Sequence, residues 1–227
     1  PTWSFLYRHL IQQLRGGHRC VAMDHLGFGL SDKPANWSYL PEAHAANLAE
    51  YISGLKITDI CAELTSFVPG RPLDDDCNCL LKFDNGAKGV LHATQIGIGE
   101  ENNLAIWVHG EKASLEWHQE HPNYLYVREI DKPEQVWKRG NGYIGAYSAA
   151  AGRGSRIPSG HPEAFLEAFA NNYMNFAETV KCAIAGEKPS ELALDFPSVE
   201  AGVRGLLFIE TVVASSKSDQ KWTPMKG

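Results

Sequence analysis

The spacing of hydrophobic residues changes once along the chain, near residues 54–57, and the change predicts two kinds of structure. Before it, apolar residues recur at helical spacing in two stretches, which predict helices that begin near Thr2 and near Pro41. The apolar run from Arg19 to Met23 predicts a short buried strand between them. The order helix–strand–helix over residues 1–56 is typical of a fragment of a parallel α/β sheet.

After residue 57 the pattern alternates with a period of two, which predicts antiparallel strands. Turn signals at Asp84-Asn85-Gly86 and Gly110-Glu111-Lys112 join neighbouring strands into two hairpins. The predicted strands occupy residues 57–68, 77–83, 87–96, 104–109, 113–117, 124–129 and 136–138.

Two helices are predicted after a loop rich in Gly, Ala and Ser at residues 140–160. The first begins at His161-Pro162-Glu163 and ends before Gly186, and the second follows Pro197. Both carry apolar side chains at helical spacing, so we expect these stripes to form core. On the first helix they are Phe165, Phe169, Tyr173, Phe176 and Val180. The predicted fold class is α+β: an open antiparallel β-sheet with helices packed on one face, in a domain over residues 57–227, plus the N-terminal helix–strand–helix fragment.

Composition narrows the partners and the location. The 227 residues include 27 acidic and 21 basic side chains without a basic stripe, so we expect neither nucleic acid nor anionic membrane as a partner. No apolar run is long enough to span a bilayer. Five cysteines at irregular positions indicate reduced thiols, and we therefore expect a cytoplasmic protein.

Two segments near the start of the chain point to a known family. They are Pro1-Thr-Trp-Ser-Phe-Leu-Tyr-Arg-His9 and Cys20-Val-Ala-Met-Asp-His-Leu-Gly-Phe-Gly-Leu-Ser-Asp-Lys-Pro34. Both resemble an early stretch of the haloalkane-dehalogenase-like branch of the α/β-hydrolases. The nucleophile of that family stands later, typically within G-x-S-x-G, and this motif does not occur in the sequence. The fragment is therefore interpreted as a structural addition.

Five segments after residue 57 resemble the C-terminal domain of the Gfo/Idh/MocA oxidoreductase family. They are Phe67-Val-Pro-Gly-Arg71, Val108-His-Gly-Glu-Lys112, Leu115-Glu-Trp-His118, Pro158-Ser-Gly-His-Pro-Glu163 and Ala168-Phe-Ala-Asn171. The resemblance implies a large open-faced antiparallel sheet, which in the family stands beside a Rossmann domain and commonly makes the oligomer contact. Family members use a nicotinamide cofactor, a catalytic Lys in an E-K-P motif, and a His on an early helix of the C-terminal portion. Together the two resemblances predict a chimeric chain.

The motifs for a nicotinamide cofactor are missing from their expected context. No G-x-G-x-x-G follows a predicted strand, so nothing prepares a site for a dinucleotide pyrophosphate. Glu187-Lys-Pro189 matches E-K-P, but it follows a helix, whereas the catalytic motif would end a Rossmann strand. We therefore expect no NAD(P) and assign no cofactor-binding residues.

Histidines supply the remaining candidate chemistry in the sheet. A turn near residue 100 would set His92 opposite Val108, and the next turn would set Val108 opposite Ser114. On this register His92 and His118 share a face about 16 Å apart, which is too far for one zinc ion. His109 would lie on the opposite face.

The tightest local cluster consists of His118, His121 and Glu116. Two imidazoles and a carboxylate are a typical ligand set for a catalytic zinc ion that keeps an open position for water. We take these three residues as the predicted metal ligands. The alternative is two solvated histidines in a turn.

His161 is the predicted acid–base residue, with Glu163 beside it as a second catalytic candidate. His161 stands where a helix begins, next to the glycine-rich loop. In the resembled family this Gly-His-Pro-Glu segment lies near the substrate cleft. A helix-capping or packing role for His161 is the alternative.

Three functions fit these features, and we rank them. The first is a metal-dependent hydrolase of activated esters or phosphate esters, in which a divalent metal, most simply zinc, activates water. The second is a non-catalytic oligomeric remnant of a Gfo/Idh/MocA oxidoreductase with a sugar-like cleft. The third is an oxidoreductase subunit that borrows a Rossmann partner. We expect a small-molecule substrate and homo-oligomerisation through the open sheet face.

Overall fold

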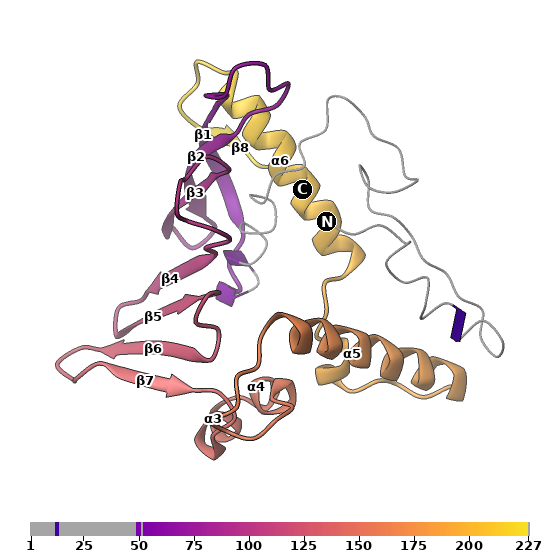
Figure 1. The fold of residues 1–227 in the computed structure, drawn as a ribbon. Helices are drawn as coiled ribbons and strands as arrows, with labels where there is room; N and C mark the ends of the chain where they lie inside the picture. The colour runs from indigo at the N-terminus through magenta and orange to yellow at the C-terminus, as the bar shows by residue number, and fades with distance from the viewer. Residues whose placement is uncertain (1–11, 14–48, 51, 227) are drawn as a thin grey trace. The chain divides into compact units, whose positions relative to one another are not determined.

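The computed structural model describes residues 12–13, 49–50 and 52–226 (Figure 1). The predicted helix–strand–helix fragment lies almost wholly outside these residues. The chain divides into two compact units. One contains the described residues up to Thr94 together with those from Gly205 onward, and the other contains Gln95–Arg204.

The first unit is built on a four-stranded antiparallel sheet with the strand order β3-β2-β1-β8. The hairpin of β2 and β3 confirms the predicted turn: Gly86 has a φ of 88°, which favours glycine, and the Ala87 N–H donates to Asn85 Oδ1 over 3.0 Å. The strands are β1 (Ile57–Thr65), β2 (Asp76–Phe83), β3 (Lys88–Thr94) and β8 (Thr223–Pro224).

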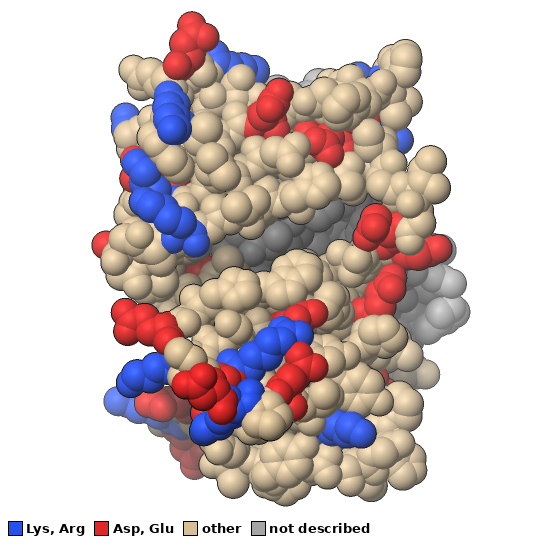
Figure 2. Space-filling view, turned by 90° about the vertical axis from the view of Figure 1, so that its left-hand side faces the viewer, with Lys and Arg blue, Asp and Glu red and all other residues tan. Residues whose placement is uncertain are grey.

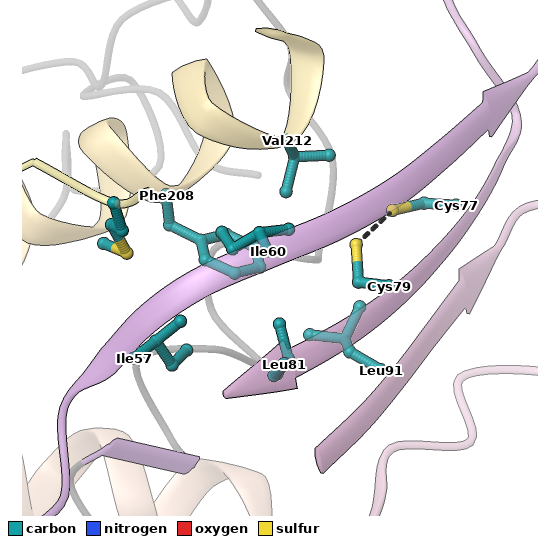
Figure 3. Packing of buried hydrophobic residues seen from close by; sticks show 9 residues of the cluster. Ile57, Ile60, Cys77, Cys79, Leu81, Leu91, Phe208 and Val212 are labelled. Carbon is teal, nitrogen blue, oxygen red and sulfur yellow. Dashed lines mark hydrogen bonds between the residues drawn. The ribbon is translucent and has the colours of Figure 1, made fainter. Parts of the chain in front are cut away.

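The core of the first unit lies between this sheet and helix α6 (Val199–Ser216). Alternation along β2 sends Cys77 and Cys79 to the same face, where Phe208 and Val212 of α6 meet them (Figure 3). The two sulfur atoms lie 3.5 Å apart. The buried cluster comprises Ile57, Ile60, Cys77, Cys79, Leu81, Leu91, Phe208, Val212 and Met225.

The second unit contains another four-stranded antiparallel sheet, with the order β4-β5-β6-β7. The described strands thus form two sheets, where the sequence predicted one. The residues between β3 and β4 form turns, and these two strands are not paired. The strands are β4 (Ala105–His109), β5 (Ala113–His118), β6 (Tyr124–Glu129) and β7 (Gln135–Lys138).

The register of the β4–β5 hairpin differs from the predicted register by one residue. The Gly110 N–H donates to the Ala113 carbonyl over 2.9 Å, so the turn holds two residues instead of three. Val108 consequently faces Leu115 and not Ser114. Because successive side chains of a strand point to opposite faces, this shift changes which side chains meet across the hairpin.

Helices follow the sheet of the second unit. The predicted loop at residues 140–160 contains two short helices, and the helix that follows ends at Gly186, with a φ of 72°, as predicted. No helix within the described ranges combines the length and the hydropathy needed to cross a bilayer. The helical segments are α3 (Gly142–Tyr147), α4 (Ala149–Gly154), α5 (Phe165–Ala185) and the 3-10 helix η2 (Glu191–Leu194).

The apolar stripe of α5 is exposed, in contrast to the prediction that it forms core. Phe165 is 61% exposed and Phe176 is 59% exposed. Polar side chains tie α5 to α4 instead, since Arg153 of α4 donates to Asn175 Oδ1 over 3.1 Å and to Glu178 over 2.7 Å. Helical spacing indicates that a face is suited to burial, but it does not specify the surface that buries it.

Candidate functional site

Arg139, directly after β7, holds the loop that leads into α5. Its guanidinium donates to Asn123 Oδ1 over 2.9 Å, to the Ile157 carbonyl over 3.1 Å and to the His161 carbonyl over 2.6 Å. It also forms an ion pair with Glu163. We term the side chains of Arg139, Asn123 and Glu163 the Arg139 anchor.

Glu163 is buried, and both of its carboxylate oxygens have donors. Oε2 pairs with Arg139, and Oε1 accepts the backbone N–H of Arg156 over 2.6 Å. The Glu163 N–H donates in turn to Asn123 Oδ1 over 3.0 Å. In this arrangement Glu163 fixes the loop, and its catalytic role remains a prediction.

His161 presents an exposed imidazole from a fixed backbone. The backbone N–H of His161 donates to the Pro158 carbonyl over 3.3 Å, and the backbone carbonyl of His161 accepts a hydrogen bond from the Arg139 guanidinium. Gly160 precedes it with a φ of 85°, a conformation that side chains rarely adopt. The loop therefore presents the His161 imidazole to solvent at a defined position. An acid–base or substrate-binding role for His161 remains a prediction.

The three predicted zinc ligands do not form a metal site. His118 Nε2 lies 2.7 Å from Glu116 Oε1, and Arg128 Nη1 lies 2.5 Å from Glu116 Oε2. These hydrogen bonds, that of His118 first, hold the pKa of Glu116 below its ordinary value. His121 lies in the next turn with an exposed side chain.

The zinc prediction is therefore wrong. Over the described ranges, no three His, Cys, Asp or Glu side chains gather closely enough to hold a metal ion. The physical reason is local, because the Arg128 guanidinium already occupies one oxygen of Glu116, and its positive charge repels a divalent cation.

Glu116 lies instead at the centre of one face of the second sheet. Directly paired residues share a face, and Glu116 is paired with Trp107 on one side and with Tyr126 on the other. The His118 ring makes edge contacts with both aromatic rings, at centroid distances of 5.5 Å and 6.5 Å. His109, predicted on the opposite face, lies on this face as well, because the register is shifted by one residue. The strand register brings Trp107, Tyr126 and His109 to the face of Glu116 and His118, and the sequence pattern did not predict this grouping.

The described residues do not cradle a dinucleotide unaided. Both sheets are antiparallel, whereas a pyrophosphate site of the Rossmann type needs a parallel strand followed by a helix. Glu187-Lys-Pro189 follows the end of α5, where the Glu187 N–H donates to the Cys182 carbonyl over 2.8 Å. This motif therefore follows a helix and not a strand, as the sequence predicted.

A family model describes part of the chain. The model of the GFO/IDH/MocA C-terminal domain matches residues 42–116, from before β1 into β5. The match begins within the segment that the sequence analysis assigned to the N-terminal fragment.

Individual relatives agree with this match. Uncharacterized oxidoreductase YfiI of Bacillus subtilis is 31% identical over 173 residues, which are 76% of this chain and 43% of that protein. The solved structure of an oxidoreductase from Sinorhizobium meliloti is 38% identical with a TM-score of 0.73, covering 80% of this chain and 50% of that one. An inositol dehydrogenase homologue from Azotobacter vinelandii, solved with NADH and myo-inositol, is 32% identical with a TM-score of 0.72, covering 81% and 48%. This chain thus spans about half the length of these relatives.

A separate, shorter similarity concerns the hydrolases. Haloalkane dehalogenase 2 of Mycobacterium bovis is 51% identical over 55 residues, which are 24% of this chain and 19% of that protein. Because this match is partial, the chimeric nature of the chain remains a prediction.

These findings correct the leading functional prediction. The prediction of a metal-dependent hydrolase is wrong, because the similarity that covers most of the chain is to oxidoreductases. In addition, the described residues include no group of three side chains that could hold a metal ion. The exclusion of NAD(P) is also wrong, because the similar structures include an inositol dehydrogenase homologue solved with NAD+ and with NADH. The second-ranked prediction, a non-catalytic oligomeric remnant of a Gfo/Idh/MocA oxidoreductase, agrees better with the findings in its family origin, while its lack of catalysis is untested. Residues 42–116 match the model of the GFO/IDH/MocA C-terminal domain, and about three quarters of the chain is similar to oxidoreductases.

Proposed function

We propose that this chain is the substrate-binding and assembly half of a nicotinamide-dependent dehydrogenase of sugars or polyols. The observation that carries the proposal is the similarity to the inositol dehydrogenase homologue over 81% of this chain, at 32% identity and a TM-score of 0.72. The nicotinamide contact would involve residues outside the described ones, because the described sheets are antiparallel and hold no dinucleotide cradle.

Two histidines are our candidates for contact with the substrate. His161 is supported by its exposed ring on a loop that the Arg139 anchor fixes. An imidazole can accept a hydrogen bond from a sugar hydroxyl or donate one to it, so His161 could bind a polyol. The resemblance also implies a His on an early helix of the C-terminal portion, and we propose His44 for it, because His44 falls within the helix predicted from Pro41 and within the matched residues 42–116. His44 lies outside the described residues.

The assembly and the origin of the chain belong to the same proposal. We propose a homo-oligomer formed through the exposed sheet face, in a cytoplasmic protein, and the irregular spacing of the five cysteines, which indicates reduced thiols, supports the reducing location. We also propose a fused chain, with its boundary between residue 42, where the family match begins, and Ile57, where β1 begins.

Calorimetric titration with myo-inositol and with glucose tests the proposal. The expected result is saturable binding of at least one of them with a Kd on the order of 1 mM, at the upper end of ordinary Michaelis constants. His161→Gln should weaken this binding at least about tenfold, the size of one lost hydrogen bond. His121→Gln is the matched control, since His121 is another exposed turn histidine of the same unit. Absence of saturable binding to either ligand overturns the proposal.

A further inference from the structure

Three aromatic side chains of the second unit lie together where β7 leads into α3. The ring centroids of Trp137 and Tyr147 lie 4.6 Å apart, and those of Trp137 and Tyr143 lie 6.3 Å apart. We call Trp137, Tyr143 and Tyr147 the aromatic patch. In Figure 2 the lowest part of the surface, at the level of α3 in Figure 1, carries few charged side chains. The patch thus lies in a mostly uncharged part of the unit.

The aromatic patch is separate from the cluster around Glu116. Trp137 is paired with Leu125, and Leu125 with Trp117, whereas Glu116 is paired with Tyr126. Because successive side chains of a strand point to opposite faces, Trp137 and Glu116 lie on opposite faces of the sheet. The patch therefore needs its own explanation.

Hydrogen bonds fix two members of the patch. The Tyr143 hydroxyl accepts the backbone N–H of Lys138 over 2.9 Å, and the Trp137 Nε1–H donates to Gln135 Oε1 over 2.8 Å. A hydroxyl that accepts a hydrogen bond can still donate its own proton to another oxygen. The patch is thus held in place and keeps a donor at its edge.

The packing of α3 onto β7 accounts for Tyr143 but not for Tyr147. Tyr147 is 74% exposed, although its ring contacts Trp137. A ring that only anchored the helix would lose most of its accessible surface, because that loss is what stabilises the contact. Tyr147 therefore presents a flat aromatic surface to solvent.

The patch adjoins the loop that carries His161. Arg139, two residues after Trp137, donates to the His161 carbonyl over 2.6 Å. The two backbones also approach closely at Gly140, where a Cβ would lie 3.2 Å from the Ser159 nitrogen. A short, fixed contact therefore joins the patch to the histidine that we propose for the substrate.

Aromatic surfaces of this kind suit one class of polyol. The face of an aromatic ring carries negative charge density, which attracts the weakly positive hydrogens of C–H bonds. A pyranose or cyclitol ring presents several C–H bonds on one side and hydroxyl groups around its edge, and these hydroxyls suit His161 and the Tyr143 hydroxyl. An open-chain polyol has no such preformed face and loses more conformational freedom when it binds.

We propose that the aromatic patch stacks on the C–H face of a cyclic polyol and thereby makes the site of His161 selective for cyclic over open-chain polyols. The inference rests on the proposed function and adds to it the class of substrate.

Calorimetric titration with a cyclic and an open-chain ligand tests the selectivity. The cyclic ligand is whichever of myo-inositol and glucose the wild type binds, and the open-chain ligand is sorbitol. The wild type should bind the cyclic ligand at least about fivefold more tightly than sorbitol. Tyr147→Ala should raise the Kd of the cyclic ligand about five- to tenfold, the size of one stacked aromatic contact, and leave that of sorbitol unchanged.

Two control variants accompany Tyr147→Ala. Tyr147→Phe keeps the ring and removes the hydroxyl, so it should bind both ligands as the wild type does. Tyr173→Ala is the matched control, since Tyr173 is 50% exposed on α5 of the same unit and lies outside the patch. It should leave both Kd values unchanged.

The remaining outcomes separate the inference from the proposed function. If His161→Gln weakens binding of the cyclic ligand and Tyr147→Ala does not, the inference fails and the proposed function stands. Tyr147→Phe that binds as weakly as Tyr147→Ala also overturns the inference, because the hydroxyl and not the ring face would then hold the ligand. If Tyr147→Ala unfolds, the wild type decides: a preference for the cyclic ligand supports the inference, and equal affinity for sorbitol overturns it.

A wild type that binds neither myo-inositol nor glucose overturns both the inference and the proposed function. Choline is titrated alongside, because aromatic rings can also hold a quaternary ammonium group through cation–π contacts. Saturable binding of choline that Tyr147→Ala abolishes, without binding of a cyclic polyol, would assign the patch to a cation and overturn the inference.

Discussion

Replacing Arg139 by methionine should destabilise the second unit strongly. The Arg139 and Glu163 side chains are only 16% and 4% exposed, so water cannot replace the lost partner. Removing one member of a buried ion pair costs about 3–5 kcal/mol, because the remaining charge is left buried. The carbonyl of His161 loses a donor as well. We therefore expect a loss of about 4 kcal/mol in the free energy of unfolding.

Urea unfolding measures this loss. With a slope of about 1–3 kcal/mol per molar urea, the midpoint of the transition should fall by more than 1 M. Lys138→Met is the matched control, because Lys138 is the neighbouring cation and is exposed, and its removal should cost less than about 0.5 kcal/mol. Amide exchange at the Glu163 N–H should accelerate in Arg139→Met and not in the control.

A second substitution separates the buried charge from the lost packing. In Arg139→Met/Glu163→Met both charges are gone, so the double variant should be more stable than Arg139→Met alone. Two results refute the reasoning. One is a loss below about 1 kcal/mol in the single variant, the range of exposed ion pairs. The other is a double variant whose loss of stability equals the sum of the losses measured in Arg139→Met and in Glu163→Met alone.

Two further predictions concern the core and the acid stability. Phe208→Ala should lower the free energy of unfolding in urea by about 3–5 kcal/mol, because Phe208 is buried in the core of the first unit. Val203→Ala, at an exposed position of α6, should lower it by less than about 0.5 kcal/mol. Hydrogen bonds from His118 and Arg128 lower the pKa of Glu116 in the folded protein. Ionised Glu116 therefore stabilises the fold at pH values above its pKa in the unfolded chain. This contribution is lost as the pH falls through the pKa of Glu116 in the folded protein. Glu116→Gln should therefore reduce the loss of stability measured by urea unfolding below about pH 4.5, and an unchanged pH profile would contradict the assignment.

Local chemistry made much of the secondary structure predictable. The Asp84-Asn85-Gly86 turn and the helix end at Gly186 both depend on backbone conformations that glycine adopts easily, and both lie where the sequence placed them. Period-two alternation likewise located β1 to β7, whereas the short strand β8 was not predicted. The division into two sheets was not predictable in this way, because ladder pairing between strands depends on the path of the turns that join them.

The candidate sites were predicted less well, because their geometry depends on register and on distant partners. One residue in the turn after Gly110 decided that His109 joins the face of Glu116 and His118. Arg128 meets Glu116 from the next strand, and that contact prevents the predicted zinc site. No local motif announces such a pair.

The sequence by itself determined most strands, the two long helices, the Asp84-Asn85-Gly86 turn and the family resemblance, since each depends on residues within a few positions of one another or on recurring motifs. The tertiary structure decided the roles of the charged residues. Glu163 was a catalytic candidate beside His161 at the predicted start of a helix, and folding places it against Arg139, 24 residues earlier, as an anchor. The apolar stripe of α5 was predicted as core, and the fold leaves it exposed. Both outcomes have one physical cause: the environment of a side chain is set by the segments that fold against it, and these are distant in the sequence.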